Sequence, residues 1–527
     1  MRWDSNLYRL CLVLPVFAML IAGCVMVGPD YRQPPVTVSP NWLEVDDQRV
    51  KTGAADHRDW WKVFNDPILD RLIDTAYREN LSLQVAGVRV LEARAQLGIV
   101  IGELYPQTQR AFGSVQKIRL SETTSQEAAS RIFAYSESQI GLSASWELDF
   151  WGRFRRAIES ADASLLSAVA DYDTTLVSLT ADVATDYITI RTLEKRLDIA
   201  RRNVDTQKES LRIAEVRFAG GTTSQRDVEQ AKTVLGSTQA TIPTLEIQLR
   251  QAKNALSVLL GMPPSHLTDL LAGSSDVPVP PPQVAVGIPA DLVRRRPDIR
   301  SAELQTSAQS AEIGVAKADL YPAFSLTGQF GFLATDVGRF SLGDMFEWRS
   351  RTGNIGPTVQ WNIFNYGQIT NRVRVQDARF QELLIQYQNA VLTAQWEVED
   401  NLIAFLKSED RAQFLGESTA AALRSLDLAV LQYRQGITDF TTVLTAEQAL
   451  LTEQDNLAST LRDISRNLVG VYRALGGGWQ VREGQDLVPA SIKEAMAKRT
   501  NWGSLLVPTV YPLTPPPPQP LIHPPQW

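Results

Sequence analysis

The feature that most constrains the fold is a long stretch without proline that follows Gly367. From Gly367 to Gly476 the chain is rich in glutamine, alanine and leucine and contains no proline. We expect one helix of about 65 residues, roughly 100 Å long at about 1.5 Å per residue, which reverses at Gln435-Gly436. A second helix returns over Asp439–Leu475. Ordinary helices have about 11 residues, so the sequence predicts an elongated molecule.

The same pattern occurs twice in the chain. The segment Trp146–Gly152 matches Trp361–Gly367 at an offset of 361 − 146 = 215, and Gly221 matches Gly436 at the same offset. A repeat of this length, kept with almost no insertion, indicates a duplicated unit. Each half is then a helix, two strands, a long helix, a reversal and a return helix.

Alternating side chains predict the strands, at about 136–149, 321–333 and 353–364. A fourth, at about 103–117, alternates poorly and is assigned by the repeat. The apolar residues of the clearest case are Ile140, Leu142, Ala144, Trp146 and Leu148. One interpretation is a soluble antiparallel sheet with one wet face, and the other is barrel strands with apolar side chains outside and polar ones inside. Four strands cannot close a barrel, so the second interpretation requires an oligomer.

The return helices carry a heptad pattern, which predicts coiled-coil packing against a neighbouring helix. Its positions in the first helix are Val228, Ala231, Leu235, Thr238, Ile242, Leu245, Leu249, Ala252, Leu256 and Leu259. Pro243 lies inside this helix and predicts a kink there, because it removes one backbone donor.

The predicted fold class is mainly α with a β portion, built from a duplicated strand, strand and long helical hairpin unit. The hairpins reverse at 220–223 and 435–438. The expected segments are a lipoprotein signal peptide (1–23), an extended N-terminal segment (24–66), the first repeat (67–260, opening with a helix to about 101), an equatorial linker (261–289), the second repeat (290–475), an equatorial C-terminal region (476–507) and a proline-rich, disordered tail (508–527).

The N-terminus has the layout of a secretory signal. Arg2 and Arg9 precede an apolar run that ends in Ile21-Ala22-Gly23-Cys24. This ending resembles the lipobox of bacterial lipoproteins, which implies a fatty acyl modification such as palmitate on Cys24 and stable anchoring by two or more chains. Val25, where aspartate would favour the inner membrane, points to the outer membrane. The alternative is an ordinary signal peptide with a chance cysteine.

Several classes of function are not expected. The net charge of −7 gives no general attraction to nucleic acid. His57, His266 and His523 lie too far apart for metal-ligand spacing. No nucleophile–base pair or phosphate loop is present, so we expect no enzyme and no cofactor beyond the lipid. After Cys24 no apolar run reaches about 18 residues, so a membrane crossing would require a closed β-barrel.

Three motifs carry a resemblance to a known family. Residues 291–299 read Asp-Leu-Val-Arg-Arg-Arg-Pro-Asp-Ile, 27–31 read Val-Gly-Pro-Asp-Tyr, and 432–436 read Gln-Tyr-Arg-Gln-Gly. Together they resemble the outer membrane efflux proteins, the TolC- and OprM-like channels of tripartite pumps. The Arg-Arg-Pro-Asp-Ile run is typical of their lipoprotein branch, the NodT type. The resemblance implies a homotrimer with a twelve-stranded β-barrel in the bacterial outer membrane and an α-helical barrel extending into the periplasm.

The resemblance also implies a function and partners. We expect a passive exit duct for small molecules, which receives them from an inner-membrane pump of the resistance-nodulation-division (RND) type with a periplasmic adaptor (membrane fusion) protein. Multidrug resistance is the typical role, although the pump chooses the substrate. An alternative in the same class is type I protein secretion. In another class, a lipid-anchored coiled-coil scaffold would explain the heptads but not the apolar strand faces.

In this family the hairpin tips lie deep in the periplasm, where the adaptor docks and the channel is held closed. The tip residues expected to contact the adaptor are Phe218, Gly220, Gly221, Tyr433, Arg434 and Gly436. Aspartates often ring the closed entrance, and Asp227 matches one of them. The corresponding positions of the second hairpin hold Thr442 and Thr445. We therefore expect a gate of Asp227 and hydroxyls that binds cations less than a fully acidic one.

Overall fold

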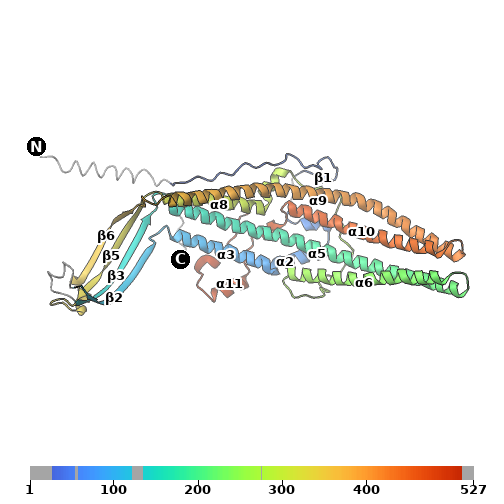
Figure 1. Ribbon diagram of the computed structural model, residues 1–527, viewed down its shortest axis with the longest axis horizontal. Coiled ribbons are helices and arrows are strands. Elements are labelled where there is room, and N and C mark those ends of the chain that lie inside the picture. Colours follow the sequence, from blue (N-terminus) through green and yellow to red (C-terminus); the bar gives the residue numbers. More distant parts are fainter. Residues whose placement is uncertain (1–25, 54–56, 122–133, 274–275, 513–527) are drawn as a thin grey trace.

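The chain forms an elongated molecule with a sheet at one end and two helical hairpins at the other (Figure 1). The computed structural model describes residues 26–53, 57–121, 134–273 and 276–512. The predicted signal peptide, Cys24 and most of the proline-rich tail lie outside these residues.

The two halves of the chain have the same order of elements. The first half contains α3 (Leu81–Gly102), β2 (Thr108–Arg119), β3 (Ala134–Leu148), α5 (Arg153–Ala219) and α6 (Gln225–Leu259). The second half contains α8 (Pro297–Ala318), β5 (Ala323–Thr335), β6 (Arg351–Gln360), α9 (Gln368–Gln435) and α10 (Phe440–Ala474). Helix α9 has 68 residues, in agreement with the prediction from its proline-free sequence.

Some boundaries differ from those expected. The first strand begins at Thr108 rather than 103, because residues 103–107 form the turn that leaves α3. The last strand ends at Gln360 rather than 364. The helix expected from Pro67 to about 101 is broken into α2 (Pro67–Glu79) and α3. Asn80 causes this break, since its side chain caps α3 by accepting a hydrogen bond from the Leu83 N–H at 2.9 Å. Helix α6 continues through Pro243.

The four long strands form one antiparallel sheet in the order β2-β3-β5-β6. Ile140 lies opposite Phe332, and Leu142 lies opposite Phe330. Because directly opposite residues share a face, one face carries the apolar series Ile140, Leu142, Ala144, Trp146, Phe324, Leu326, Phe330, Phe332, Ile355 and Val359. The other face is polar, with Ser143, Ser145, Thr327, Gln329, Asn354 and Thr358. The alternation predicted from the sequence is therefore present in β3, β5 and β6, whereas β2 places Phe112 and Ile118 on the polar face.

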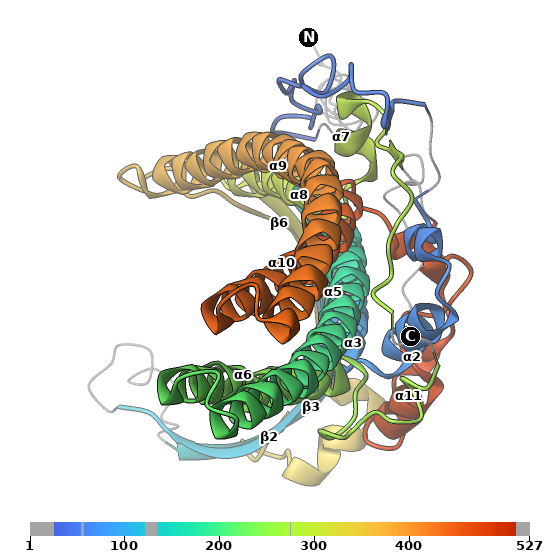
Figure 2. The same ribbon diagram turned by 90° about the vertical axis from the view of Figure 1, so that its right-hand side faces the viewer.

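The long helices form a single curved layer rather than a compact bundle (Figure 2). The equatorial elements, among them α2, α7 (Leu292–Arg295) and α11 (Ala490–Ala497), lie on the convex side of this layer (Figure 2). The largest apolar core lies where they meet the long helices, and includes Trp60, Leu69, Leu72, Tyr187, Ile188, Leu402 and Phe405. The concave side is thus lined by the long helices themselves.

Two buried arginines join the equatorial region to the long helices. Arg482, in a short helical turn at Trp479–Arg482, forms a paired contact with Asp173 of α5, with Nη2 to Oδ2 at 2.9 Å, and both side chains are 1% exposed. Arg296 of the Arg-Arg-Pro motif pairs with Asp298 and with Glu397 of α9, each at 2.7 Å. The motif therefore has a structural role here.

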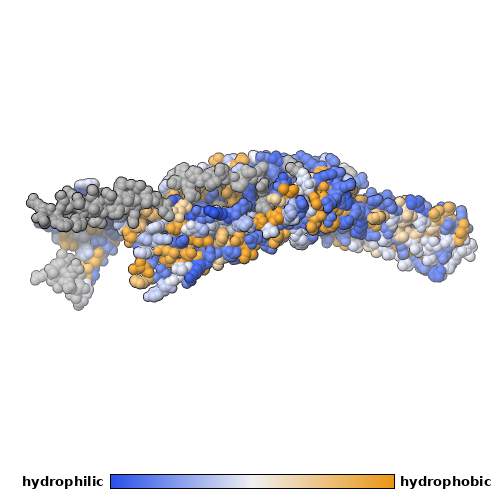
Figure 3. Space-filling model, turned by 90° about the horizontal axis from the view of Figure 1, so that it is seen from above, coloured by the Kyte–Doolittle hydropathy of each residue, from blue (hydrophilic) through white to orange (hydrophobic). Residues whose placement is uncertain are grey.

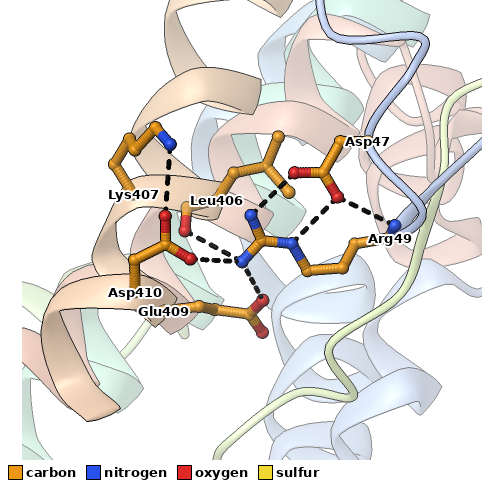
Figure 4. A network of polar contacts seen from close by, with 6 residues as sticks. All are labelled: Asp47, Arg49, Leu406, Lys407, Glu409 and Asp410. Carbon is orange, nitrogen blue, oxygen red and sulfur yellow. Dashed lines mark hydrogen bonds and ion pairs between the residues drawn. The ribbon is translucent and has the colours of Figure 1, made fainter. Parts of the chain in front are cut away.

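An N-terminal arm runs along the outside of the layer. A β-carbon on Gly28 would lie 2.5 Å from the Gly314 Cα, so this glycine allows the arm to pack directly on α8. Further along, Arg49 donates to the Leu406 carbonyl at 3.2 Å and pairs with Asp410 at 2.9 Å and Glu409 at 3.3 Å (Figure 4). The arm ends in β1 (Val50–Lys51), parallel to β4 (Val284–Ala285). Arg49 thus fastens the arm to the middle of α9.

The surface is uneven in its polarity. Hydrophobic residues gather at the sheet end of the helical body, whereas the hairpin end is mostly hydrophilic in the same view (Figure 3). Exposed apolar side chains next to the sheet include Trp361, Ile363, Phe364 and Tyr366. Within the described residues, no helix combines the length and the apolar character that a membrane crossing needs.

Candidate functional site: the hairpin tips

Both tips use the same reversal. In the first, the Thr222 N–H donates to the Arg217 carbonyl at 2.9 Å, and in the second the Ile437 N–H donates to the Gln432 carbonyl at 2.9 Å. The donor and the acceptor of the second bond each lie 215 positions after their counterparts in the first bond. Gly221 and Gly436 have φ values of +72° and +77°, which a residue with a side chain rarely adopts. Glycine at these positions therefore follows from the backbone of the turn.

An apolar cluster joins the two tips. It is formed by Ala214, Val228, Ala231, Leu426, Ala429, Tyr433, Phe440, Val443, Leu444, Ala446 and Leu450. Tyr433 is 3% exposed, and its ring lies 5.1 Å from that of Phe440. The structure therefore places Tyr433 inside the tip, where burial removes it from direct contact with an adaptor in this conformation. Phe218 is 44% exposed, and Arg434 is also exposed.

Polar contacts also link the tips. The Arg217 guanidinium lies 4.5 Å from the centre of the Tyr433 ring and donates to the Tyr433 carbonyl. Arg434 approaches Glu209 of α5 at 3.9 Å. The end of α5 is thereby held to the end of α9, so the two hairpins of one chain do not move freely at their tips.

Asp227 lies in the first turn of α6 and is largely buried. The Thr223 hydroxyl donates to its carboxylate, and Arg226 lies 3.6 Å away. Burial alone would raise the pKa of Asp227, but hydrogen bonds from Thr223 and Ser224 outweigh it and hold the pKa below the ordinary value. The carboxylate therefore carries its charge at neutral pH and is occupied in capping α6.

Thr442 serves the equivalent turn of the second hairpin. Its N–H and hydroxyl donate to the Asp439 carboxylate at 3.1 Å and 2.9 Å. Because Ser224 and Asp227 correspond to Asp439 and Thr442, the carboxylate has changed places with the hydroxyl within the cap. Sequence reasoning missed Asp439. Aspartate directly before a helix is the signal that could have identified it.

Thr445 contributes less to this turn. Its hydroxyl donates to the Thr441 carbonyl at 2.9 Å on an exposed face of α10. The second hairpin therefore keeps one acidic group, at Asp439 instead of at Thr442 or Thr445. The gate of Asp227 and hydroxyls stays a prediction, and Asp439 adds an acid beside Thr442.

A polar ladder runs along the seam between the two hairpins, where α5 meets α10. Its positions on α5 repeat every seven residues, at Arg196, Asn203 and Ser210. Arg196 pairs with Asp455 at 2.6 Å, and the Asn203 amide donates to Gln454 at 2.9 Å. Ser210 donates to Glu447. The seam between the hairpins therefore combines these polar contacts with the apolar cluster at the tips.

Glu447 is the most deeply buried acid of this ladder, at 1% exposed. Burial raises its pKa, and the hydrogen bond from Ser210 opposes this only in part. Its other carboxylate oxygen and both amide atoms of the buried Gln207 have no hydrogen-bond partner in the part of the chain that the structure describes. An ionised Glu447 would therefore weaken the seam. In the same part of the chain, no group of three or more His, Cys, Asp or Glu residues is arranged to hold a metal ion.

Known proteins share this sequence pattern and this fold. The sequence profile of the family described as outer membrane efflux protein matches residues 72–262 and 288–477, which are the two repeats. The chain belongs to the outer membrane efflux protein family. This efflux protein is 31% identical over 468 residues to the pyoverdine export outer membrane protein OpmQ of Pseudomonas aeruginosa, covering 88% of this chain and 96% of OpmQ.

Other relatives have the same extent. The efflux protein is 32% identical over 477 residues to the solvent efflux pump outer membrane protein SrpC of Pseudomonas putida, covering 89% and 99% of the two chains. The solved outer-membrane channel OprN superposes with a TM-score of 0.79 at 33% identity, covering 86% and 99%. The likeness extends over nearly the whole of each relative, so the mainly α architecture and the outer-membrane location follow for this efflux protein.

Proposed function

We propose that the efflux protein is the passive outer-membrane exit duct of a tripartite efflux system. The observation that supports this most is the two-faced sheet, apolar on one side and polar on the other, continued by helices of about 67 residues. An apolar face can contact lipid while the polar face lines an aqueous channel. Membership of the outer membrane efflux protein family fits a duct rather than an enzyme.

The proposed duct is a homotrimer. In the sheet order β2-β3-β5-β6, the outer edges of β2 and β6 have no partner strand among the described residues. Open edges are not stable in lipid, because their N–H and C=O groups would be left without hydrogen bonds. Three copies would supply twelve strands, and pairing β6 of one copy with β2 of the next would close the barrel. The long helices would continue it as an α-helical barrel.

The proposed partners follow from the family. We infer a periplasmic adaptor protein at the hairpin tips and an inner-membrane pump of the RND type, with small molecules as cargo. The names of the relatives OpmQ and SrpC refer to pyoverdine export and to solvent efflux, which supports small molecules rather than proteins as cargo. We also propose that Cys24 carries the lipid anchor, which incorporation of labelled palmitate into wild type and its loss in Cys24→Ala would test.

Single-channel conductance in planar bilayers tests the duct. The purified efflux protein is expected to give discrete current steps, with low conductance while the tips are closed. A coiled-coil scaffold would give no steps at any voltage, and that result would overturn the proposal. Cross-linking in cells with residues placed near Phe218, followed by identification of the linked proteins, tests the adaptor. Recovery of a secretion system alone would favour type I secretion.

A further inference from the structure

Three basic residues lie on the apolar face of the sheet, in its two outer strands. Lys117 and Arg119 lie in β2 opposite Ser136 and Ala134, and Arg351 lies in β6 opposite Phe332. Alternate residues of a strand share a face, and so do directly opposite residues of neighbouring strands. The register therefore places all three cations on the face that carries Ile140, Leu142, Phe330 and Phe332.

The same three residues lie at one end of that face. Arg119 is the last residue of β2, and Arg351 is the first residue of β6. Both positions are at the end of the sheet that points away from the helices, since β2 is entered from α3 and β6 leads into α9 (Figure 1). The helical end of this face is uncharged and carries Gln109, Trp146, Leu148, Phe324 and Val359. The charge on this face is thus confined to its outer end.

Acidic residues of the strands are on the opposite face. Glu137 and Glu147 of β3 alternate with Ile140 and Leu142, so they point to the polar side. Just beyond β5, the Asp336 carboxylate accepts a hydrogen bond from the Ser136 backbone N–H at 2.5 Å. Asp336 lies opposite Ser136 and therefore in line with Lys117 on the apolar face, and the two charges interact. The three cations at this end of the face thus outnumber the acid that the described residues place beside them.

An aromatic side chain contacts Arg351. Its guanidinium lies 5.0 Å from the centre of the Trp348 ring, and its Nη1 donates to the Trp348 carbonyl at 2.9 Å. The Trp348 ring lies 6.4 Å from that of Phe332 and is 67% exposed. Exposed tryptophan beside a cation is the pattern of a membrane–water interface. Arg351 is thus held beside an exposed tryptophan at the outer end of the sheet.

We propose that Lys117, Arg119 and Arg351 form a binding site for the phosphate groups of anionic lipid in the outer leaflet, in particular a glycolipid whose headgroup carries phosphate monoesters. The proposal rests on the proposed function, because it requires the apolar face to contact lipid. Guanidinium and ammonium groups pair strongly with phosphate. Cations on a lipid-facing surface are costly unless they reach the interface or an anionic partner.

The proposed trimer makes the site composite. Lys117 and Arg119 belong to one outer strand of the sheet, and Arg351 belongs to the other. If β6 of one copy pairs with β2 of the next, Arg351 of the first copy lies on the same face as Lys117 and Arg119 of its neighbour. One lipid with two phosphates would then bridge two copies, and the trimer would hold three such sites.

Native mass spectrometry of the purified trimer tests the site. The protein is released from neutral phosphatidylcholine nanodiscs that contain either lipid A with its phosphates or the same lipid after their removal. Wild type is expected to retain the phosphorylated form in preference. The Lys117→Gln/Arg119→Gln/Arg351→Gln variant is expected to lose this preference, by roughly fivefold for each cation removed. Arg110→Gln is the matched control, since Arg110 lies in β2 on the polar face.

Each outcome decides the question. Equal retention of both lipids by wild type, or unchanged preference in the triple variant, would overturn the site. Displacement of the lipid by millimolar inorganic phosphate would show a small-anion site instead. Conductance of the same variant in neutral bilayers is expected to match wild type, whereas absence of conductance in wild type would refute the duct itself. If the triple variant does not assemble, Arg351→Gln alone is compared with Arg110→Gln.

Discussion

Glu447 shows how one buried carboxyl can make the seam between the hairpins sensitive to pH. Burial raises its pKa in the fold, and the hydrogen bond from Ser210 opposes this only in part. The stability it contributes is fully present below the unfolded pKa of about 4.3 and is lost as pH rises through the folded pKa. Glu447→Gln should therefore stabilise the protein at pH 8 by about 1–3 kcal/mol and weaken the pH dependence of thermal unfolding.

A control on the neighbouring helix separates this effect from a general loss of charge. Glu209 of α5 is exposed, and its hydrogen bond from Arg212 lowers its pKa. Glu209→Gln should not raise stability at pH 8. An equal rise in both variants would contradict the assignment to Glu447.

A second prediction at the residue scale concerns the two acids that cap the return helices. Asp227 caps α6 and Asp439 caps α10, so each alanine substitution should loosen its own hairpin by about 1 kcal/mol. If these acids also form the closed gate, both variants should raise the conductance of the closed channel. Thr442→Val, which keeps the size and removes only a hydroxyl, should raise it less. Unchanged conductance in Asp227→Ala would remove Asp227 from the gate.

At the scale of elements, the pair of Arg482 and Asp173 joins the equatorial region to α5. Both groups are fully buried, so Arg482→Met leaves an uncompensated carboxylate and should cost about 3–5 kcal/mol. Chemical unfolding of the trimer measures this loss. The double variant Arg482→Met/Asp173→Leu should recover most of it, and no recovery would mean that packing rather than charge explains the cost.

For the N-terminal arm we expect a smaller loss of stability. The Arg49 side chain is 24% exposed and contacts α9 through Glu409 and Asp410, so solvent screens part of the interaction. Arg49→Ala should cost about 1 kcal/mol at most, but it should make the arm more accessible to protease. Limited proteolysis followed by N-terminal sequencing checks this, with Arg58→Ala, whose partner Glu483 is exposed, as the control.

At the scale of the whole molecule, one chain has a sheet with two open edges and a curved helical layer with an uncovered concave side. Such a chain cannot complete a channel alone. Native mass spectrometry should therefore give the mass of three chains, and only that species should conduct. A conducting monomer would contradict the proposed closure between β6 and β2.

The sequence predicted much of this architecture because its signals are periodic and long. The duplication at an offset of 215, the proline-free helix after Gly367 and the alternation around Ile140 each appear in the structure. The break at Asn80 was not predicted, because a single capping residue inside a helical pattern changes no period. The role of Asp439 was not predicted either, because the gate aspartates of the family correspond to Thr442 and Thr445 rather than to Asp439.

What the sequence determined by itself was the set of elements, because helix and strand periods and glycine reversals are local properties of the chain. What only the tertiary structure decided was which side chains meet. The ladder of Arg196, Asn203 and Ser210 exists because α10 lies beside α5, some 250 residues away in the chain. The basic end of the apolar face exists because strand register aligns β2 with β6 through two intervening strands. Contacts between distant segments depend on packing, which no local pattern encodes.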